Sequence, residues 1–226
     1  MEISVVIPIL NEEDSIENAI HSAQEAGADE VIVVDGGSRD NSVDRALSSG
    51  ASVESSESGR AIQQNVGARR ARGDVLLFLH GDNRLGRRSL DQVRETMSNP
   101  AVAAGAFRQL IESPGLRFRL LERGNAFRAK WLGLPYGDQG IFIRAATFRE
   151  LGGFPEIPIM EDLAFMKSCR RYGWPAILPG PIYVSARRWK KHGVLQQTAR
   201  NWWLLGAYRL GVSPNKLVTY YPKHDS

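Results

Sequence analysis

Residues 74–83 read DVLLFLHGDN, and this stretch does most to indicate the fold. Its apolar run is nearly continuous, which is typical of a strand buried on both faces of a parallel sheet. The run ends abruptly in a polar corner that carries one carboxylate, Asp82. Ligands of α/β proteins bind beyond the carboxyl ends of parallel strands. The corner is therefore a working site, a damaged site, or only a turn after a buried strand.

Two earlier stretches have the same character. Residues 3–10 (ISVVIPIL) and 30–36 (EVIVVDG) are also nearly continuous in apolar residues. Helical patterns over residues 12–27, 40–50 and 59–74 separate these runs. Alternation of strands and helices predicts an α/β domain with a doubly wound, Rossmann-like, mostly parallel sheet and right-handed crossovers.

Polar residues follow each of the three runs. Asn11 and Glu12 come after the first, Asp35 ends the second, and Asp82 follows the third. A single acid in a loop says little, because loops are polar in any case. Parallel strands bring their carboxyl ends to one edge of the sheet, so three polar ends together favour a ligand site there.

The second half of the chain, beyond about residue 99, is less regular. Residues 102–109 and 137–144 are predicted strands, residues 116–133 a basic amphipathic helix, and residues 161–173 another helix. The sequence contains no internal repeat and no Gly/Ser linker. We therefore expect the two halves to share one continuous sheet.

Composition limits the class of protein. A chain of 226 residues with 42% hydrophobic and 24% charged residues suits a folded globular domain rather than a disordered chain. One cysteine, Cys169, excludes an internal disulfide and fits a reducing compartment. The start of the chain has no signal-peptide pattern, and no apolar stretch approaches the roughly 20 residues that span a bilayer. These features predict a cytoplasmic protein.

Charge is unevenly distributed along the chain. The net charge of +4 and the pI near 9.4 indicate an anionic partner, which is a nucleoside diphosphate, an anionic lipid or a nucleic acid. Residues 184–226 carry eight basic residues against a single acid, Asp225. The eight are Arg187, Arg188, Lys190, Lys191, Arg200, Arg209, Lys216 and Lys223.

Several nucleotide and hydrolase signatures are missing from the sequence. It has no G-x-G-x-x-G fingerprint and no Walker loop, which disfavours a hydride-transfer enzyme and a P-loop kinase. Neither a zinc-spaced His-Cys cluster nor a G-x-S-x-G elbow is present.

The motifs that are present, taken in order, resemble the family 2 glycosyltransferases of the GT-A fold. These are VVIPILNEE (5–13), VVDGGSRDNS (33–42), the helix and corner of residues 59–83, and EDLAFMKSCRRYG (161–173). A short bacterial subgroup resembles the chain more closely in its His-x-Asp corner, its YGDQ string at 136–139, and an SARRW...HG segment at 185–193.

The resemblance implies a nucleoside-diphosphate-sugar donor and a Mg²⁺ or Mn²⁺ cofactor. It implies donor contacts by Pro8, Asn11, Glu12, Asp35, Arg60, His80 and Asp82. Asp82 is the expected metal ligand, and His192 is either a second ligand or a surface histidine in a basic loop. Basic residues of 187–192 are expected to add positive charge at the leaving group. The chain departs from the family pattern at His80 and Gly36, where carboxylates are usual.

The resemblance also implies an inverting displacement with Asp162 as the base. From residue chemistry alone, Glu161 and Asp162 either serve catalysis or cap a helix that begins at Leu163. The acceptor or the donor sugar is expected to contact Tyr136, Asp138, Gln139 and Glu161. We expect a single domain with a nucleotide-sugar half (1–99), an acceptor and catalytic half (100–193) and a basic aromatic tail (194–226).

A lipid-like acceptor is indicated by the tail. Residues 194–210 form a predicted helix whose apolar face holds Val194, Leu195, Thr198, Trp202, Leu205 and Tyr208. Such a helix suits the headgroup region of an anionic membrane, here its cytoplasmic face, unless the face packs as ordinary core. Two rival interpretations are an inactive nucleotide-sugar-binding module and a nucleic-acid-binding protein. No RRM, KH or helix-turn-helix signature supports the latter, so we expect no nucleic-acid partner.

Overall fold

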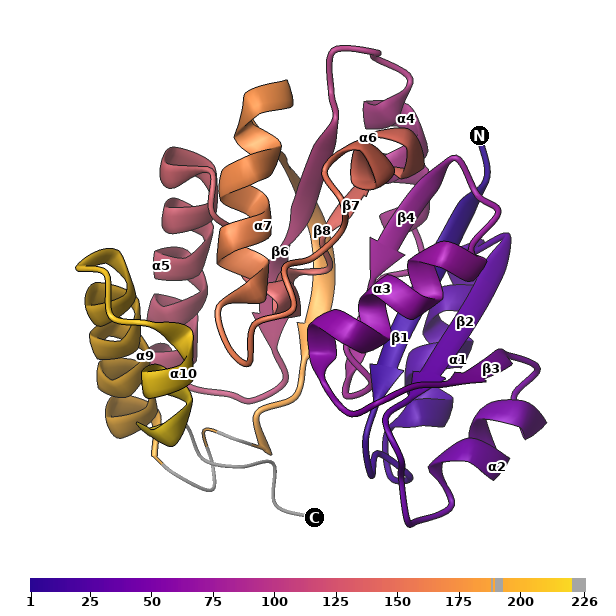
Figure 1. The fold of residues 1–226 in the computed structure, drawn as a ribbon, viewed down its shortest axis with the longest axis horizontal. Helices are drawn as coiled ribbons and strands as arrows, with labels where there is room; N and C mark the ends of the chain where they lie inside the picture. Colours follow the sequence, from indigo (N-terminus) through magenta and orange to yellow (C-terminus); the bar gives the residue numbers. More distant parts are fainter. Residues whose placement is uncertain (188, 190–192, 221–226) are drawn as a thin grey trace.

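The computed structural model describes residues 1–187, 189 and 193–220 (Figure 1). Within them the strands form one sheet in the order β3-β2-β1-β4-β7-β6-β8-β5. The strands are β1 (Ile3–Ile9), β2 (Glu30–Asp35), β3 (Ser52–Ser55), β4 (Val75–Phe78), β5 (Asn83–Leu85), β6 (Ala104–Ile111), β7 (Phe142–Arg144) and β8 (Ala176–Val184). The predicted α/β class with a mostly parallel sheet is confirmed.

One short strand joins the two halves of the sheet. Strands β1 to β4 pair in parallel, and β6 pairs in parallel with β8. Between these two groups, β7 runs antiparallel to both β4 and β6, while β5 pairs antiparallel with β8. The sheet is therefore continuous, as predicted, with the first half on the right of Figure 1.

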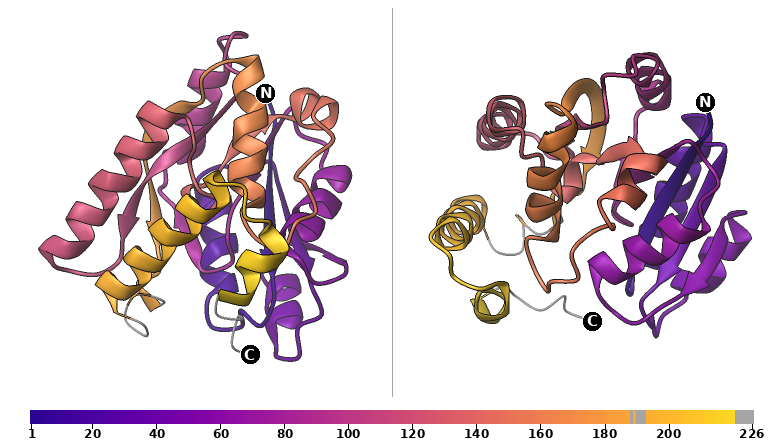
Figure 2. Two further views of the ribbon diagram at one scale, coloured as in Figure 1. Left: turned by 60° about the vertical axis from the view of Figure 1, so that its left-hand side comes forward. Right: turned by 45° about the horizontal axis from the view of Figure 1, so that its top comes forward.

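Helices cover both faces of this sheet (Figures 1 and 2). They are α1 (Ile16–Glu25), α2 (Ser42–Ser48), α3 (Arg60–Arg70), α4 (Ser89–Met97), α5 (Leu116–Leu132), α6 (Ala145–Glu150), α7 (Glu161–Cys169), α9 (Val194–Arg209) and α10 (Pro214–Leu217), with 3₁₀ turns η1 (Gly137–Gln139), η2 (Arg170–Tyr172) and η3 (Val218–Tyr220). Successive residues of β1 point to opposite faces. Val5 and Ile7 pack with α1 and α4, whereas Val6 packs with α3, α6 and α7.

Two sequence predictions of local structure need correction. Residues 137–144 are not one strand: they form η1 and then β7, because Gly140 takes a left-handed conformation with φ of 63° that ends the turn. Asn83, the last residue of the polar corner, begins a short strand that was not predicted. It is buried in β5, and its pairing partner Val184 in β8 lies far along the chain.

The predicted apolar face of the tail helix is also partly wrong. In α9, Trp202 is 58% exposed, whereas Leu204 and Leu205 are buried. Leu204 packs in a small cluster with Ile159. Trp189 of the basic segment is buried edge-to-face against Phe118, with ring centroids 6.5 Å apart, so it is not available to stack on a base. No helix in the described part of the chain is long and apolar enough to cross a bilayer.

Helix α3 is held tightly against the strand ends. Gln63 donates from Nε2 to the carbonyl oxygens of Ile9 (2.7 Å) and Val34 (2.8 Å), which closes the carboxyl ends of β1 and β2 onto the helix. Further along, a Cβ on Gly67 would lie 2.4 Å from Val6 Cγ1. Only glycine allows this approach, which brings the second half of α3 close against β1.

The close approach at Gly67 predicts a clear stability effect. Gly67→Ala inserts a methyl group into Val6 and should lower the free energy of unfolding by about 1–3 kcal/mol. Gly124→Ala in α5 is the control, because no atom lies within 4 Å of its Cβ position. That change should raise stability by up to about 1 kcal/mol through helix propensity. Urea unfolding measures both, and equal effects would contradict the tight packing of α3.

Candidate functional site

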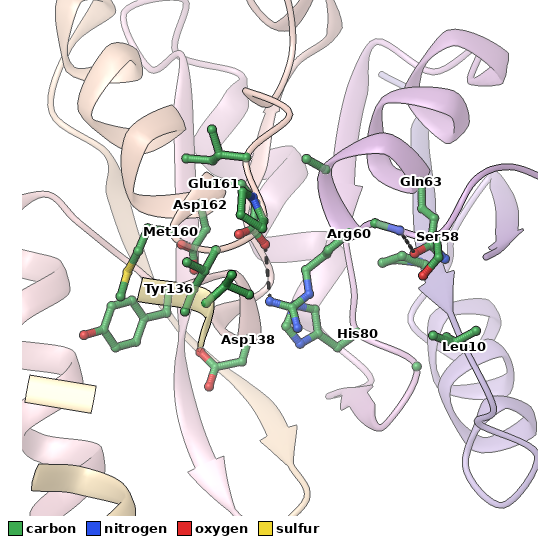
Figure 3. Close-up of a pocket in the computed structure, with 18 of the residues that line it drawn as sticks. Leu10, Ser58, Arg60, Gln63, His80, Tyr136, Asp138, Met160, Glu161 and Asp162 are labelled. Carbon is green, nitrogen blue, oxygen red and sulfur yellow. Dashed lines mark hydrogen bonds and ion pairs between the residues drawn. The ribbon is translucent and has the colours of Figure 1, made fainter. Parts of the chain in front are cut away.

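A cleft of about 860 Å³ opens where the carboxyl ends of β1 and β4 face the second half of the chain (Figure 3). It brings together most of the residues that the sequence predicted for a site. These are Pro8, Glu12, Arg60, His80, Asp82, Tyr136, Asp138, Glu161 and Asp162. Asn11, Asp35 and Gln139 lie outside its lining. His192 lies outside the described residues.

Two carboxylates and one guanidinium form the corner after β4. Arg187 Nη2 lies 3.1 and 3.3 Å from the Glu12 carboxylate oxygens and 3.9 Å from Asp82 Oδ2. Burial raises the pKa of Glu12, and the neighbouring Asp82 charge raises it further, while Arg187 opposes both. The corner thus holds two hard anionic ligands that already face a positive charge. The sequence pointed to Asp82 as the carboxylate here, and the fold adds Glu12.

A divalent cation fits the chemistry of this corner. Mg²⁺ and Mn²⁺ prefer oxygen ligands, and Mg²⁺ usually takes one or two carboxylates, with substrate phosphates and water as the remaining ligands. Glu12 and Asp82 supply such carboxylates. Arg187 lies close to both, as expected where two carboxylates attract a positive charge. No group of three or more His, Cys, Asp or Glu side chains that could hold a metal occurs among the residues described. Phosphate oxygens of a ligand, together with water, would suit the remaining coordination positions.

The opposite wall of the cleft carries two adjacent acids at the start of α7. The helix begins at Glu161, not at Leu163, so both acids lie in its first turn, and Met160 precedes it at the N-cap position. Glu161 is 3% exposed and lies 3.2 Å from Arg60 Nη1. Burial raises the pKa of Glu161, with a further contribution from Asp162, against the lowering effect of Arg60.

Asp162 is oriented by backbone donors. Its Oδ2 accepts from the Gly137 N–H at 2.6 Å, and its Oδ1 accepts from the Leu163 N–H at 2.7 Å. Gly137 begins η1 and lies between the two walls of the cleft. A Cβ placed on it would be 3.1 Å from His80 Nε2 and 3.4 Å from Asp162 Oδ2. His80 from the corner after β4 and Asp162 from α7 therefore both lie next to the Cβ position of this one glycine.

Arg128 is a site residue that the sequence did not reveal. It is 3% exposed, and its Cζ lies 3.2 Å from the centroid of the Tyr136 ring. Its guanidinium donates to Leu134 O (3.1 Å), Asn125 Oδ1 (3.0 Å) and Gln139 Oε1 (2.8 Å). Burial lowers the pKa of this guanidinium. In the sequence it is one of several basic residues of an amphipathic helix, and nothing distinguishes it from its neighbours.

Three predicted ligand contacts lie in supporting positions. Gln139 is fully buried and donates to Phe107 O at 3.1 Å, besides accepting from Arg128. Asp35 accepts from the Gly37 N–H at 3.0 Å and also from the Ser38 N–H. Asn11 Oδ1 accepts from the Arg39 N–H at 2.9 Å. These bonds hold the loops that border the cleft, and direct contact with a ligand stays a prediction for all three.

Comparison with known proteins connects the cleft to a family. Residues 4–150 match the model of glycosyl transferase family 2. A stretch of 94 residues is 38% identical to glucosyl-3-phosphoglycerate synthase of Mycobacterium tuberculosis, covering 35% of this chain and 28% of that protein. The glucosyl-3-phosphoglycerate synthase of Mycolicibacterium paratuberculosis is 37% identical with the same coverage. The alignment thus spans little more than a quarter of the length of these relatives.

Solved structures share the fold. S. aureus TarS 1–349 superposes with a TM-score of 0.64 at 19% identity, over 82% of this chain and 61% of that one. Glucosyl-3-phosphoglycerate synthase from Mycobacterium tuberculosis, in complex with Mn²⁺, UDP and glucosyl-3-phosphoglycerate, gives 0.58 at 24% identity, over 81% and 70%. The family model covers more than half of the chain and includes the β1 and β4 edges of the cleft. The chain therefore belongs to glycosyl transferase family 2.

Proposed function

We propose that the protein is an inverting glycosyltransferase, which moves a sugar from a nucleoside-diphosphate sugar to an acceptor hydroxyl. The observation that carries this proposal is the meeting at Gly137 of the corner after β4 and the acid of α7. Transfer requires a stabilised diphosphate on one side of the anomeric carbon and a base on the other. Both walls of the cleft have the residue types for these roles.

The donor side of the reaction belongs to the first half of the chain. Asp82 and Glu12 would hold Mg²⁺ or Mn²⁺, which supplies Lewis-acid neutralisation of a diphosphate when bound. The M. tuberculosis structure, which contains Mn²⁺ and UDP, supports the use of a divalent metal with a nucleoside diphosphate. Arg187, which lies 3.9 Å from Asp82, adds fixed positive charge for the leaving group. His80 stands where the family pattern has a carboxylate, and an imidazole N–H there suits a hydrogen bond to a ribose hydroxyl or a phosphate.

The base on the acceptor side is Asp162. The Gly137 N–H fixes one carboxylate oxygen and thereby orients the side chain in the cleft. Asp162 accepts the proton of the acceptor hydroxyl as that oxygen attacks the anomeric carbon and the bond to the diphosphate breaks. One base and no nucleophilic carboxylate give inversion of configuration. Glu161 is held by Arg60, so it positions that cation across the cleft instead of taking the proton.

The acceptor is a lipid-like molecule at a cytoplasmic membrane face. Support comes from the apolar residues that are at least partly exposed on the second-half side of the cleft, which are Ile157, Pro158, Met160 and Val218. An acceptor with an apolar portion removes this surface from water. The polar groups of Tyr136 and Asp138 at the same wall suit the hydroxyl-bearing end.

The raised pKa of the buried Glu161 predicts that the stability of the protein depends on pH. Because its pKa is raised above 4.5, the folded protein keeps this proton over a pH range in which the unfolded chain loses it. Stability therefore falls as the pH rises through that range. The difference in unfolding free energy between wild type and Glu161→Gln should shrink from pH 4.5 upward. A difference that widens instead would mean that Arg60 lowers the pKa below its ordinary value.

Asp162→Asn separates the base from a structural role. The amide keeps the shape and the bond from the Gly137 N–H but accepts no proton, so turnover should fall by about 10² or more. Donor affinity and the melting temperature should stay near those of wild type. Turnover near the parental rate would contradict the assignment. A wild-type protein that binds donors but turns over none of them with any acceptor would instead be a binding module.

Asp82→Ala tests the metal corner. Calorimetric titration with UDP should show Mn²⁺-dependent binding to the wild type and loss of that dependence in the variant, because a hard carboxylate ligand is gone. Asp91→Ala in α4, away from the cleft, is the control and should bind as wild type does. Binding of UDP and Mn²⁺ by the Asp82 variant with parental affinity would contradict the site. A thermal-shift screen of UDP-, GDP- and TDP-sugars then identifies the donor.

A further inference from the structure

Helix α5 has apolar residues on two opposite faces. Phe118 and Ala129 on its inner face are buried, and the helix packs along β6. On the outer face, large apolar side chains recur at intervals of one or two helical turns, which places them in one stripe. They are Leu116, Leu120, Phe127 and Trp131, with 72%, 57%, 63% and 62% of their surface exposed. So much exposed apolar surface in one stripe marks a binding surface.

Positive charge borders the stripe. Arg123 and Lys130 lie along one edge of the helix, Arg117 lies on the other, and all three are exposed. No ion pair joins them to an acid in the part of the chain that the structure describes. The acid of this helix, Glu122, is occupied on the other side, where it lies 3.0 Å from Arg119 and accepts from the Ile111 N–H.

An aromatic cluster extends the stripe beyond the end of the helix. The rings of Phe127 and Trp131 lie 6.1 Å apart. Trp174, 56% exposed, donates from Nε1 to Lys130 O at 2.8 Å, which anchors it against the last turn of α5. Arg170 lies over its ring at 5.7 Å. Two tryptophans among cations are typical of a membrane–water interface, where an indole buries its apolar ring and keeps its N–H bonded.

We propose that the outer face of α5, with Trp174 at its end, docks on the surface of an anionic lipid bilayer. The leucine and aromatic side chains enter the boundary between headgroups and acyl chains, and Arg117, Arg123 and Lys130 meet the anionic headgroups. Helix α9 lies along the same side of the molecule (Figures 1 and 2), and its Trp202 and Trp203 are 58% and 52% exposed.

A bilayer fits this face better than a second copy of the chain. Two copies joined about a two-fold axis bury the same patch of each, so the cations of two α5 helices, which have no ion-pair partner among the described residues, would be brought into one interface. Like charges that meet in an apolar interface oppose association. Anionic lipid supplies the complementary charge in any register.

The position of α5 links docking to the cleft. On its inner side, Arg128 stacks on Tyr136 of the acceptor wall. A bilayer on the outer side therefore lies one helix away from the site. That this proximity delivers a lipid-like acceptor rests on the proposed function, whereas docking itself does not.

Co-sedimentation with vesicles tests the docking without donor, metal or acceptor. Wild type should bind vesicles of phosphatidylcholine with phosphatidylglycerol, and binding should weaken as salt rises and with phosphatidylcholine alone. Phe127→Ser with Trp131→Ser, and separately Arg123→Glu with Lys130→Glu, should each reduce the lipid partition coefficient by about tenfold or more. Matched controls are Leu47→Ser on α2, where the leucine is 55% exposed, and Arg69→Glu at the exposed end of α3. Both controls should bind as wild type does.

Three results would overturn the proposal. One is a wild type that stays in the supernatant with anionic vesicles at low salt. Another is vesicle binding by both α5 variants at the parental level. The third is a dimer, seen by sedimentation velocity without lipid, that the Phe127 and Trp131 changes abolish. UDP binding by the same variants is measured in parallel and should be unchanged, so loss of docking and failure of the donor site are distinguishable.

Discussion

Strand β7 pairs with β4 on one side and with β6 on the other, and the arrangement of the cleft depends on this pairing. Leu77 of β4 faces Phe142 of β7, and three residues further along the first strand stands His80. The turn η1 directly precedes β7, so the same pairing brings Gly137 beside His80. Asp162 then reaches the backbone of Gly137 from α7. A strand of three residues thus joins the two walls of the site.

Arginine side chains lie close to the carboxylates of the cleft and offset part of their negative charge. Arg60 faces the buried Glu161, and Arg187 faces Glu12 and Asp82. Arg128 is buried beneath Tyr136 and bonds to amide and carbonyl oxygens instead of a carboxylate. A buried charge is costly unless hydrogen bonds compensate it, which these contacts do. Under the proposed function, Arg60 and Arg187 are cations of the described residues that meet an anionic donor, whereas Asp162 is held by backbone N–H groups.

The parts of this arrangement that sequence patterns predicted are those with local signals. Continuous apolar runs such as residues 3–10 predicted the buried parallel strands, and the order of motifs predicted most, but not all, of the polar residues that line the cleft. The prediction of one strand over residues 137–144 was wrong, because a glycine in the left-handed conformation interrupts it. The sequence does not distinguish Arg128 from the other basic residues of its helix, because only the fold shows which of them faces inward. In α9, burial follows the contacts of Leu204 with Ile159 and not the average face of the helix.

The central claim is that both walls of the cleft act on one nucleotide-sugar donor. Hydrogen–deuterium exchange of the wild-type chain tests it directly, because ligand contacts and closure slow local opening. With UDP and Mn²⁺ together, exchange should slow at residues 8–12 and 80–83 on one wall and at 136–138 and 160–163 on the other. UDP without Mn²⁺ should give weaker protection at both. Protection confined to residues 193–220, or protection that is the same with and without Mn²⁺, would contradict the account.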